Sequence, residues 1–308
     1  LIRQEAMEYD EDPEDSAGDL LDRAIWGDDP MGMPVIGTVA NIEGFTRQDL
    51  VRHVQSHYVG EKTVVVAAGN FDVPAWLEQA AQLFAGMPAS ADPAVALPPQ
   101  PAKYVGQALA QRFTQVSQVF VNLAYPLVFE QLQGEHPQRA RLVASLAAHL
   151  LGEGMSSPLV DTVRERLGLA YTAYAAMEGG DVWANFIVHA VTTPDKLEAL
   201  VAATGGLLRA QAAGIDPVHL ERAKNQLAVS RVRAGERTYA TMERAVEDLF
   251  AHGSVTSVAE TLAMIDGIGA EEVRKVFERM LAHPPAVAIT GKGANARTVR
   301  QLAAGLAA

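Results

Sequence analysis

The sequence predicts an α+β protein of two homologous, duplicated domains, each a mostly antiparallel sheet with helices packed on one face, the first domain being incomplete. Three observations support this prediction. Short apolar runs of strand character alternate with longer amphipathic helical patterns. A proline-rich segment divides the 308 residues into two unequal parts, and an internal repeat relates these parts to each other.

The proline-rich segment marks the expected boundary between the domains. It shows no helical period, which is typical of an extended linker. Its prolines are Pro93, Pro98, Pro99 and Pro101. We therefore expect residues 1–92 to form the C-terminal part of a first domain, residues 93–104 to form the linker, and residues 105–308 to form a second domain.

The internal repeat relates residues 41–70 to residues 264–293 at a constant offset of 223 positions. Both copies predict a short turn, an amphipathic helix, a loop and a buried strand, which is TVVVA at Thr63–Ala67 and AVAIT at Ala286–Thr290. If the two domains have similar lengths, roughly 120 residues are missing in front of the first copy. The chain is therefore expected to be an N-terminally truncated fragment.

Local patterns predict the remaining elements. Glu5 lies on a helix that the EDPED sequence ends, and a second helix runs from about Asp15 to Trp26. The second domain is expected to contain strands, helices and a strand pair that turns at Gly179–Gly180. The expected ranges are 116–127 for a strand, 137–152 for a long helix, 157–168 for a short helix and 170–193 for the strand pair.

Composition limits the possible functions. The chain has no cysteine, which excludes disulfides and cysteine nucleophiles and leaves only His, Asp and Glu as common metal ligands. Residues 1–60 hold 13 acidic and 4 basic side chains, against 24 and 21 in the remainder, which argues against nucleic-acid binding. No apolar run is long enough to span a bilayer, and no signal peptide is visible. We expect a protein of the cytoplasm or the periplasm, and the sequence does not decide between them.

Two stretches together carry a resemblance to a known family. They are QEAMEYDEDPEDSAGDLLDRAIWGDDPMGMPVIGTVANIEGFT and LGEGMSSPLVDTVRERLGLAYTAYA. In this order they resemble the M16 family of zinc metallopeptidases, which includes insulinase, pitrilysin and the mitochondrial processing peptidase. The small bacterial members are the most similar. The resemblance implies two homologous domains that close like a clam shell around a peptide.

The resemblance also implies a zinc site in the first domain. Members of the family bind zinc through H-x-x-E-H and a further Glu on a downstream helix. This sequence contains no H-x-x-E-H, so no catalytic residue is expected within the chain. The downstream Glu aligns with Glu5, which the resemblance makes a zinc ligand of the intact parent. The alternative is an exposed helix carboxylate, because one carboxylate alone does not hold zinc.

The same resemblance assigns Arg164 and Tyr171 in RERLGLAY to substrate binding. In the family, an Arg and a Tyr at this spacing reach from the second domain toward the substrate. A guanidinium can donate several hydrogen bonds to a peptide carbonyl, and a Tyr hydroxyl can stabilise a developing oxyanion. The alternative is a surface Arg at a helix end and a Tyr in the core.

Other candidate motifs favour structural roles. His53 and His57 share a helix face at i, i+4 spacing, but no third ligand is evident nearby. The LGEGMSS loop lacks the Lys and the preceding strand of a phosphate-binding loop, so we interpret it as a tight connector. The strand pair within residues 170–193 is expected to lie in the core.

These observations lead to one functional hypothesis and two alternatives. The chain is interpreted as a fragment of a zinc-dependent metalloendopeptidase that cleaves peptides inside a closed chamber, and this fragment alone is expected to be inactive. A non-catalytic partner subunit of an M16-type heterodimer is the first alternative. A structural scaffold like the core subunits of the respiratory cytochrome bc1 complex is the second. The expected partners are a peptide substrate and another M16-type subunit in a homodimer or heterodimer.

Overall fold

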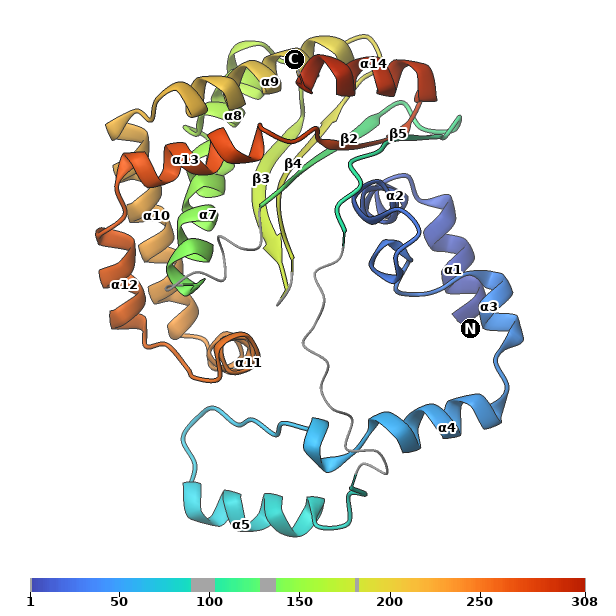
Figure 1. The fold of residues 1–308 in the computed structure, drawn as a ribbon, viewed down its shortest axis with the longest axis vertical. Helices are drawn as coiled ribbons and strands as arrows, with labels where there is room; N and C mark the ends of the chain where they lie inside the picture. The colour runs from blue at the N-terminus through green and yellow to red at the C-terminus, as the bar shows by residue number, and fades with distance from the viewer. Residues whose placement is uncertain (1, 90–102, 128–136, 181–182, 308) are drawn as a thin grey trace.

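The computed structural model describes residues 2–89, 103–127, 137–180 and 183–307, and a five-stranded sheet forms its centre (Figure 1). The order of the strands is β1-β5-β2-β4-β3. The strands are β1 (Ala108–Arg112), β2 (Val119–Pro126), β3 (Thr172–Gly179), β4 (Ala184–Thr192) and β5 (Ala286–Gly291). Strands β1 and β5 pair in parallel, whereas the other three pairings are antiparallel. The predicted α+β fold with a mostly antiparallel sheet is confirmed.

One face of the sheet, called the inner face here, carries the main hydrophobic core. Several helices cover it, as predicted, and Phe186 of β4 meets Phe277 edge to face at 5.5 Å between ring centroids. Both rings are fully buried. The helices in this part are α7 (Pro137–Gly152), α8 (Pro158–Val160), α9 (Leu197–Ala213), α10 (Pro217–Gly235), α11 (Thr238–His252), α12 (Val258–Asp266), α13 (Ala270–Met280) and α14 (Ala296–Ala307), with a π-turn, η3, at Asp161–Arg166.

The opposite face of the sheet, called the outer face, is covered by a helix from the N-terminal part of the chain. This helix is α2 (Asp15–Trp26), and it follows α1 (Ile2–Glu11) (Figure 1). The apolar side of α2 packs on alternate residues of the central strands, including Ala124 and Ile187. Because strand side chains alternate between the two faces, both faces of this sheet are buried.

Hydrogen bonds join α2 to the second part of the chain at both ends. The carbonyls of Ala24 and Ile25, in the last turn of α2, accept hydrogen bonds from the backbone N–H groups of Gln107 and Val105 at 2.8 and 2.7 Å. Carbonyls in the last turn of a helix have no partner within the helix, so these contacts satisfy them. Near the other end, the side chain of Asn122 donates to the carbonyl of Ala17 at 3.1 Å.

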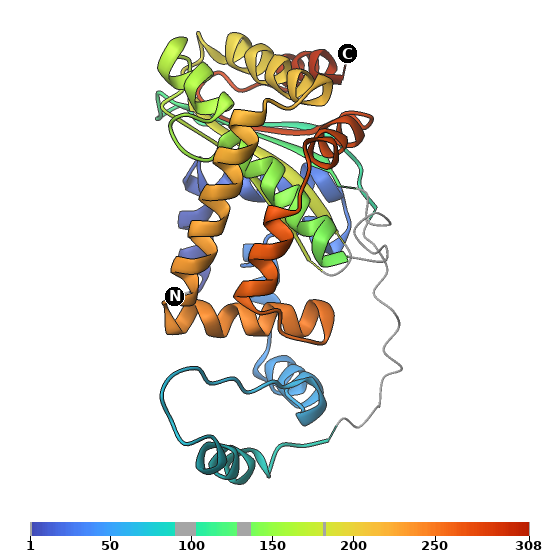
Figure 2. The ribbon, with the colours of Figure 1, turned by 90° about the vertical axis from the view of Figure 1, so that its left-hand side faces the viewer.

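Residues 30–89 form small helices that extend away from the sheet (Figures 1 and 2). They are η1 (Pro30–Gly32), α3 (Val39–Gly44), α4 (Arg47–His57), η2 (Gly60–Lys62) and α5 (Val73–Phe84). The predicted strand at Thr63–Ala67 was wrong, because this segment is not assigned to any strand. Its counterpart β5 lies between β1 and β2, whereas the TVVVA backbone has no partner strand in the described residues, and Val64 and Val65 are exposed.

The helices nevertheless agree with a duplicated fold. The offset of 223 positions relates α4 to α13 and α5 to α14, residue for residue at both ends of each helix. It also relates the start of α2 to the start of α11. Most of the linker predicted at residues 93–104 lies outside the described residues, so its structure stays a prediction. None of the described helices is both long and apolar enough to cross a membrane.

Candidate substrate-contacting site

The segment before β3 is a tight, internally bonded turn. Gly154 adopts φ +80°, and its carbonyl accepts hydrogen bonds from both the hydroxyl and the backbone N–H of Ser157 at 2.7 and 3.1 Å. Ser157 is fully buried, and Pro158 then begins α8 at a position where its missing N–H costs nothing. The LGEGMSS segment is therefore a tight connector, as its sequence predicts.

The π-turn η3 continues directly from α8 and holds the next residues in place. Val163 is fully buried, and its carbonyl accepts the N–H groups of Leu169 and Ala170 at 2.7 and 3.1 Å. Gly168 sits at φ +58°, a left-handed conformation that lets the chain reverse between η3 and β3. The backbone on either side of this reversal is therefore fixed by the core.

The two predicted substrate-binding residues lie on this fixed backbone. Arg164 belongs to η3, and its Nε lies 3.4 Å from the Glu165 carboxylate, with about half of the Arg164 side chain exposed. Tyr171 precedes β3 and donates its backbone N–H to the Val191 carbonyl at 2.9 Å. Its side chain is 64% exposed, so the alternative of a core Tyr was wrong. Both side chains are open to solvent while their backbones are anchored.

Strand β3 is an edge strand, which corrects the expectation that the whole strand pair lies in the core. Every residue of β4 is buried, whereas Thr172, Tyr174 and Glu178 of β3 are exposed. Tyr174 stacks on His189 at 4.9 Å between ring centroids, and Nδ1 of His189 lies 2.7 Å from Oδ1 of Asn122. Burial lowers the pKa of His189. Only the inner strand of the pair is core, because a strand at the edge of a sheet has one open side.

Carboxylates from α2 and β3 gather beside this edge. The Asp22 side chain is partly exposed, but the protein around it removes enough water to raise the pKa of its carboxyl to about 6, and the like charges of Glu178 and Asp19 act in the same direction. Partial loss of hydration also raises the pKa values of Asp19 and of Glu178, whose side chain keeps one face open to solvent. The carboxylate of Asp22 is therefore held in a position that disfavours its charge at neutral pH.

Replacing Asp22 with Asn is expected to stabilise the protein at neutral pH. An acid whose pKa is raised on folding binds more protons in the folded state, so it loses stability as the pH rises from about 4 to about 6. The uncharged Asn removes this loss and should raise the Tm by about 1–2 °C at pH 7.5. Thermal unfolding at pH 4 and pH 7.5 checks the prediction, with Asp28→Asn, on the exposed loop after α2, as the control. An equal gain at both pH values would contradict it.

The predicted metal ligand, Glu5, stands alone. It lies on α1, where Ala6 is the only buried residue, and its neighbour Glu8 accepts a hydrogen bond from Gln4 at 3.1 Å. Among the described residues, no group of three His, Asp or Glu side chains could hold a metal ion. His53 and His57 approach to 4.5 Å between ring centroids on exposed turns of α4, without a third ligand. The described residues therefore do not form a zinc site by themselves.

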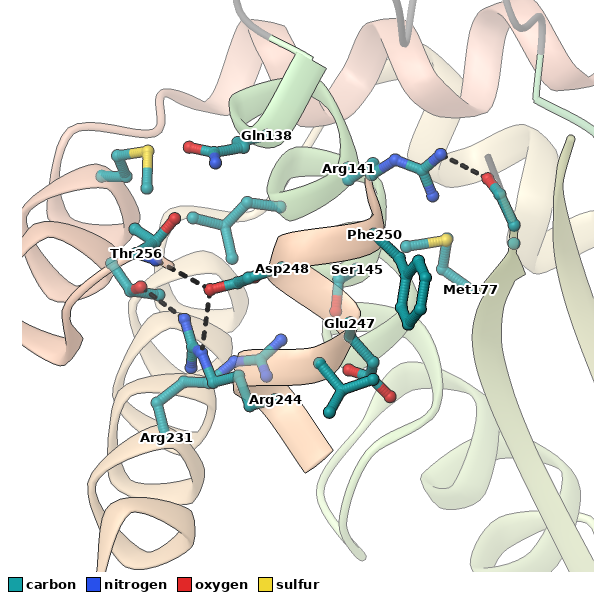
Figure 3. Close-up of a pocket in the computed structure, with 16 residues that line it drawn as sticks. Gln138, Arg141, Ser145, Met177, Arg231, Arg244, Glu247, Asp248, Phe250 and Thr256 are labelled. Carbon is teal, nitrogen blue, oxygen red and sulfur yellow. Dashed lines mark hydrogen bonds and ion pairs between the residues drawn. The ribbon is translucent and has the colours of Figure 1, made fainter. Parts of the chain in front are cut away.

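Sequence reasoning missed a cavity of about 560 Å³ on the inner-face side of the molecule. It lies between α7, α10, α11 and α12, beside the end of β3, and Arg231 and Arg244 contribute to its lining (Figure 3). No local pattern could indicate it, because its walls come from segments more than 100 residues apart.

Comparison with known proteins shows a family relationship. Residues 44–227 match the family model described as the peptidase M16 inactive domain. A curated relative is an uncharacterized zinc protease of Mycobacterium tuberculosis, which is 28% identical over 98% of this chain and 68% of that protein. This chain thus spans about two thirds of the length of that relative.

Solved structures show the same fold. A chain of complex III2 from Candida albicans, with Inz-5 bound, superposes with a TM-score of 0.82 at 18% identity, over 98% of this chain and 73% of that chain. A peptidase M16 inactive domain from Pseudomonas fluorescens superposes with a TM-score of 0.78 at 20% identity, over 94% of this chain and 68% of that chain. At these identities the likeness concerns the fold alone. The family model covers more than half of the chain, and the chain therefore belongs to the M16 peptidase family.

Proposed function

We propose that this chain is the substrate-contacting part of a zinc-dependent metalloendopeptidase that cleaves peptides inside a closed chamber. Its membership of the M16 family and its relatives named as zinc proteases support this proposal. The observation that carries it is the position of Arg164 and Tyr171, which are exposed side chains on an anchored backbone at the head of an open edge strand.

We propose a role in binding for each residue, and the geometry supports it. An extended peptide can add to the open edge of β3 through backbone hydrogen bonds, which need no particular side chains. Arg164 keeps several N–H donors beyond the one near Glu165, and these can hold a peptide carbonyl. Tyr171 directly precedes β3. Its hydroxyl can donate a hydrogen bond to an oxyanion on a peptide that pairs with this strand.

We also propose that Glu5 supplies one carboxylate ligand to the zinc, with the remaining ligands outside this chain. When bound, zinc polarises the scissile carbonyl and activates water. Since the sequence contains no H-x-x-E-H, the chain by itself is expected to show no peptide hydrolysis. In this proposal residues 1–92 belong to the zinc domain, residues 93–104 link the domains, and residues 105–308 form the substrate-contacting domain.

A pair of variants, made in the full-length zinc protease to which we propose that this chain belongs, separates the two roles. Tyr171→Phe is expected to lower kcat about 100-fold with unchanged zinc content, because one oxyanion donor is lost. Glu5→Gln is expected to lower both zinc content and cleavage, because one metal ligand is lost. Zinc is measured by atomic absorption and cleavage with a fluorogenic peptide. Tyr239→Phe and Glu8→Gln are matched controls, since both residues are exposed. Normal zinc content in Glu5→Gln would sink the ligand assignment, and normal turnover in Tyr171→Phe would sink the oxyanion role.

A second candidate function is that of a non-catalytic partner subunit. The matched model is named an inactive domain, and one structural neighbour belongs to a multi-subunit complex. In that role Arg164 and Tyr171 would still guide a peptide, but zinc would be held by a second M16-type subunit. Purification of the longer protein decides between them, because a partner subunit would contain no zinc and would stimulate cleavage only when mixed with its catalytic subunit.

A further inference from the structure

The cavity between α7, α10, α11 and α12 has the size of a ligand site. Its volume of about 560 Å³ falls within the range of small-molecule and peptide pockets. Figure 3 shows Arg231, Arg244 and Asp248 gathered on one side of it, with Arg141, Met177 and Phe250 on the other. Charged side chains therefore lie on both sides of the cavity, and the apolar Met177 and Phe250 lie near Arg141.

Most charged groups around the cavity already have partners. Arg244 donates to the hydroxyl of Thr261 at 2.6 Å, and its Nε lies 3.9 Å from the Asp248 carboxylate. Asp248 also accepts the backbone N–H of Thr256 at 2.9 Å. Glu247 is exposed, so water screens its charge.

Arg231 is the exception. In the part of the chain that the structure describes, its guanidinium makes no ion pair, and its Nε is shielded from solvent without a hydrogen-bond partner. Burial lowers the pKa of Arg231, and the nearby charge of Arg244 acts in the same direction, whereas Glu247 and Asp248 oppose the shift. An arginine stays charged in a protein, so Arg231 is a partly buried cation that forms no direct ion pair in the described residues, although the charges of Glu247 and Asp248 act on it.

The side of the cavity that carries Met177 leads to the edge strand of the candidate site. Met177 lies on β3, and Gly179 and Gly180 at the end of this strand also line the cavity. Tyr171 precedes the same strand at its other end. A peptide that pairs with the edge of β3 would therefore have one end at Tyr171 and the other at this cavity.

From these contacts we infer that the cavity binds the carboxylate of a peptide, with Arg231 as its principal partner and with Met177, Phe250 and Leu142 receiving an apolar side chain. A planar carboxylate matches the guanidinium fork, and its single negative charge would provide the ion-pair partner that Arg231 does not have among the described residues. A phosphate carries about two charges at neutral pH and would place the second one near Asp248. This inference deepens the proposed function, since it concerns one end of the same class of substrate.

Binding to this chain alone tests the inference without requiring cleavage. A fluorescently labelled heptapeptide with an apolar last residue is titrated as the free acid and as the C-terminal amide, and its anisotropy is followed. The free acid is expected to bind about tenfold or more tightly than the amide. A third peptide, amidated and carrying Glu as its penultimate residue, separates a side-chain carboxylate from the terminal one. Recovery of tight binding by this peptide would assign the site to acidic side chains as well.

Substitutions on α10 locate the effect. Arg231→Gln is expected to abolish the difference between acid and amide, and Arg231→Lys to keep part of it, because Lys retains the charge without the fork. Among the described residues Arg231 forms no ion pair, and its Nε has no hydrogen-bond partner, so circular dichroism should be unchanged. Arg233→Gln, exposed on the same helix, is the matched control and should bind like the unaltered chain. Equal affinity for acid and amide would overturn the inference, as would equal effects of the Arg231→Gln and Arg233→Gln variants. Inorganic phosphate and acetate are also tested as competitors of the bound peptide. Stronger competition by phosphate than by acetate would overturn the inference as well. Such a failure would leave the zinc and turnover predictions untouched.

Discussion

Replacing Trp26 with Ala is expected to lower the free energy of unfolding by about 3–5 kcal/mol, as is typical for truncating a large buried aromatic side chain. Trp26 is 4% exposed and meets Trp183 edge to face at 5.7 Å between ring centroids. It packs in the outer-face cluster with Ala286 and Ala288 of β5. The small alanine side chains of this cluster cannot extend into the space that the indole leaves, so the variant would keep a cavity between α2 and the sheet.

Urea denaturation followed by circular dichroism measures this loss. Met33→Ala is the control, because Met33 directly follows η1 and is 58% exposed, so its change should stay within about 0.5 kcal/mol. A Trp26 variant as stable as the Met33 variant would contradict the packing of α2 on the outer face. The outer face of the sheet would then not be buried by α2.

Replacing Gly152 with Ala is expected to destabilise the protein by about 3 kcal/mol, at the upper end of over-packing penalties. A Cβ at Gly152 would lie 2.1 Å from the backbone nitrogen of Ala175 and 2.7 Å from its Cβ. Ala175 is paired with Val188 in the sheet, so its backbone cannot yield without breaking the contact between β3 and β4. Helix α7 would have to move away from β3, or β3 away from the sheet.

The matched control for this substitution is Gly206→Ala on α9. No atom lies within 4 Å of the added Cβ, and alanine favours helix by up to about 1 kcal/mol relative to glycine, so this variant should be slightly more stable. Thermal and urea unfolding of both variants provide the comparison. A Gly152 variant as stable as the Gly206 variant would show that α7 does not approach β3 so closely.

Local signals in the sequence predicted several elements well. The predicted helix from about Asp15 to Trp26 is α2, and the predicted range 137–152 is α7. Both have boundaries set nearby, by the EDPED break before α2 and by a terminal glycine in α7. The repeat likewise predicted α4 and α13 as counterparts.

The errors concern features that depend on distant partners. Thr63–Ala67 has the composition of a strand but lacks a neighbouring strand to bond with, whereas the less typical sequence ALAQR forms β1 because β5 lies beside it. The sequence could not show that α2 crosses to the sheet of the second part. It could not show that β3 is an edge either, since strand order is a tertiary property.

The residues of the candidate site also fall into those that the sequence could predict and those that it could not. Arg164 and Tyr171 were assigned from the family resemblance, and the structure adds that both are exposed on an anchored turn. Arg231 carries no local signal, because its importance comes from a cavity that four helices enclose. The role of Glu5 depends on ligands beyond the described residues, so its assignment stays a prediction.

The most direct test of the central claim, that this chain holds a peptide along β3, is amide hydrogen exchange with and without a saturating extended peptide. The account predicts slower exchange for the amides of residues 171–179, since an added strand would pair with the open edge of β3. Strand β1, at the other edge of the same sheet, is the internal control and should exchange at an unchanged rate. Unchanged exchange along β3, or equal slowing at β1, would contradict the claim.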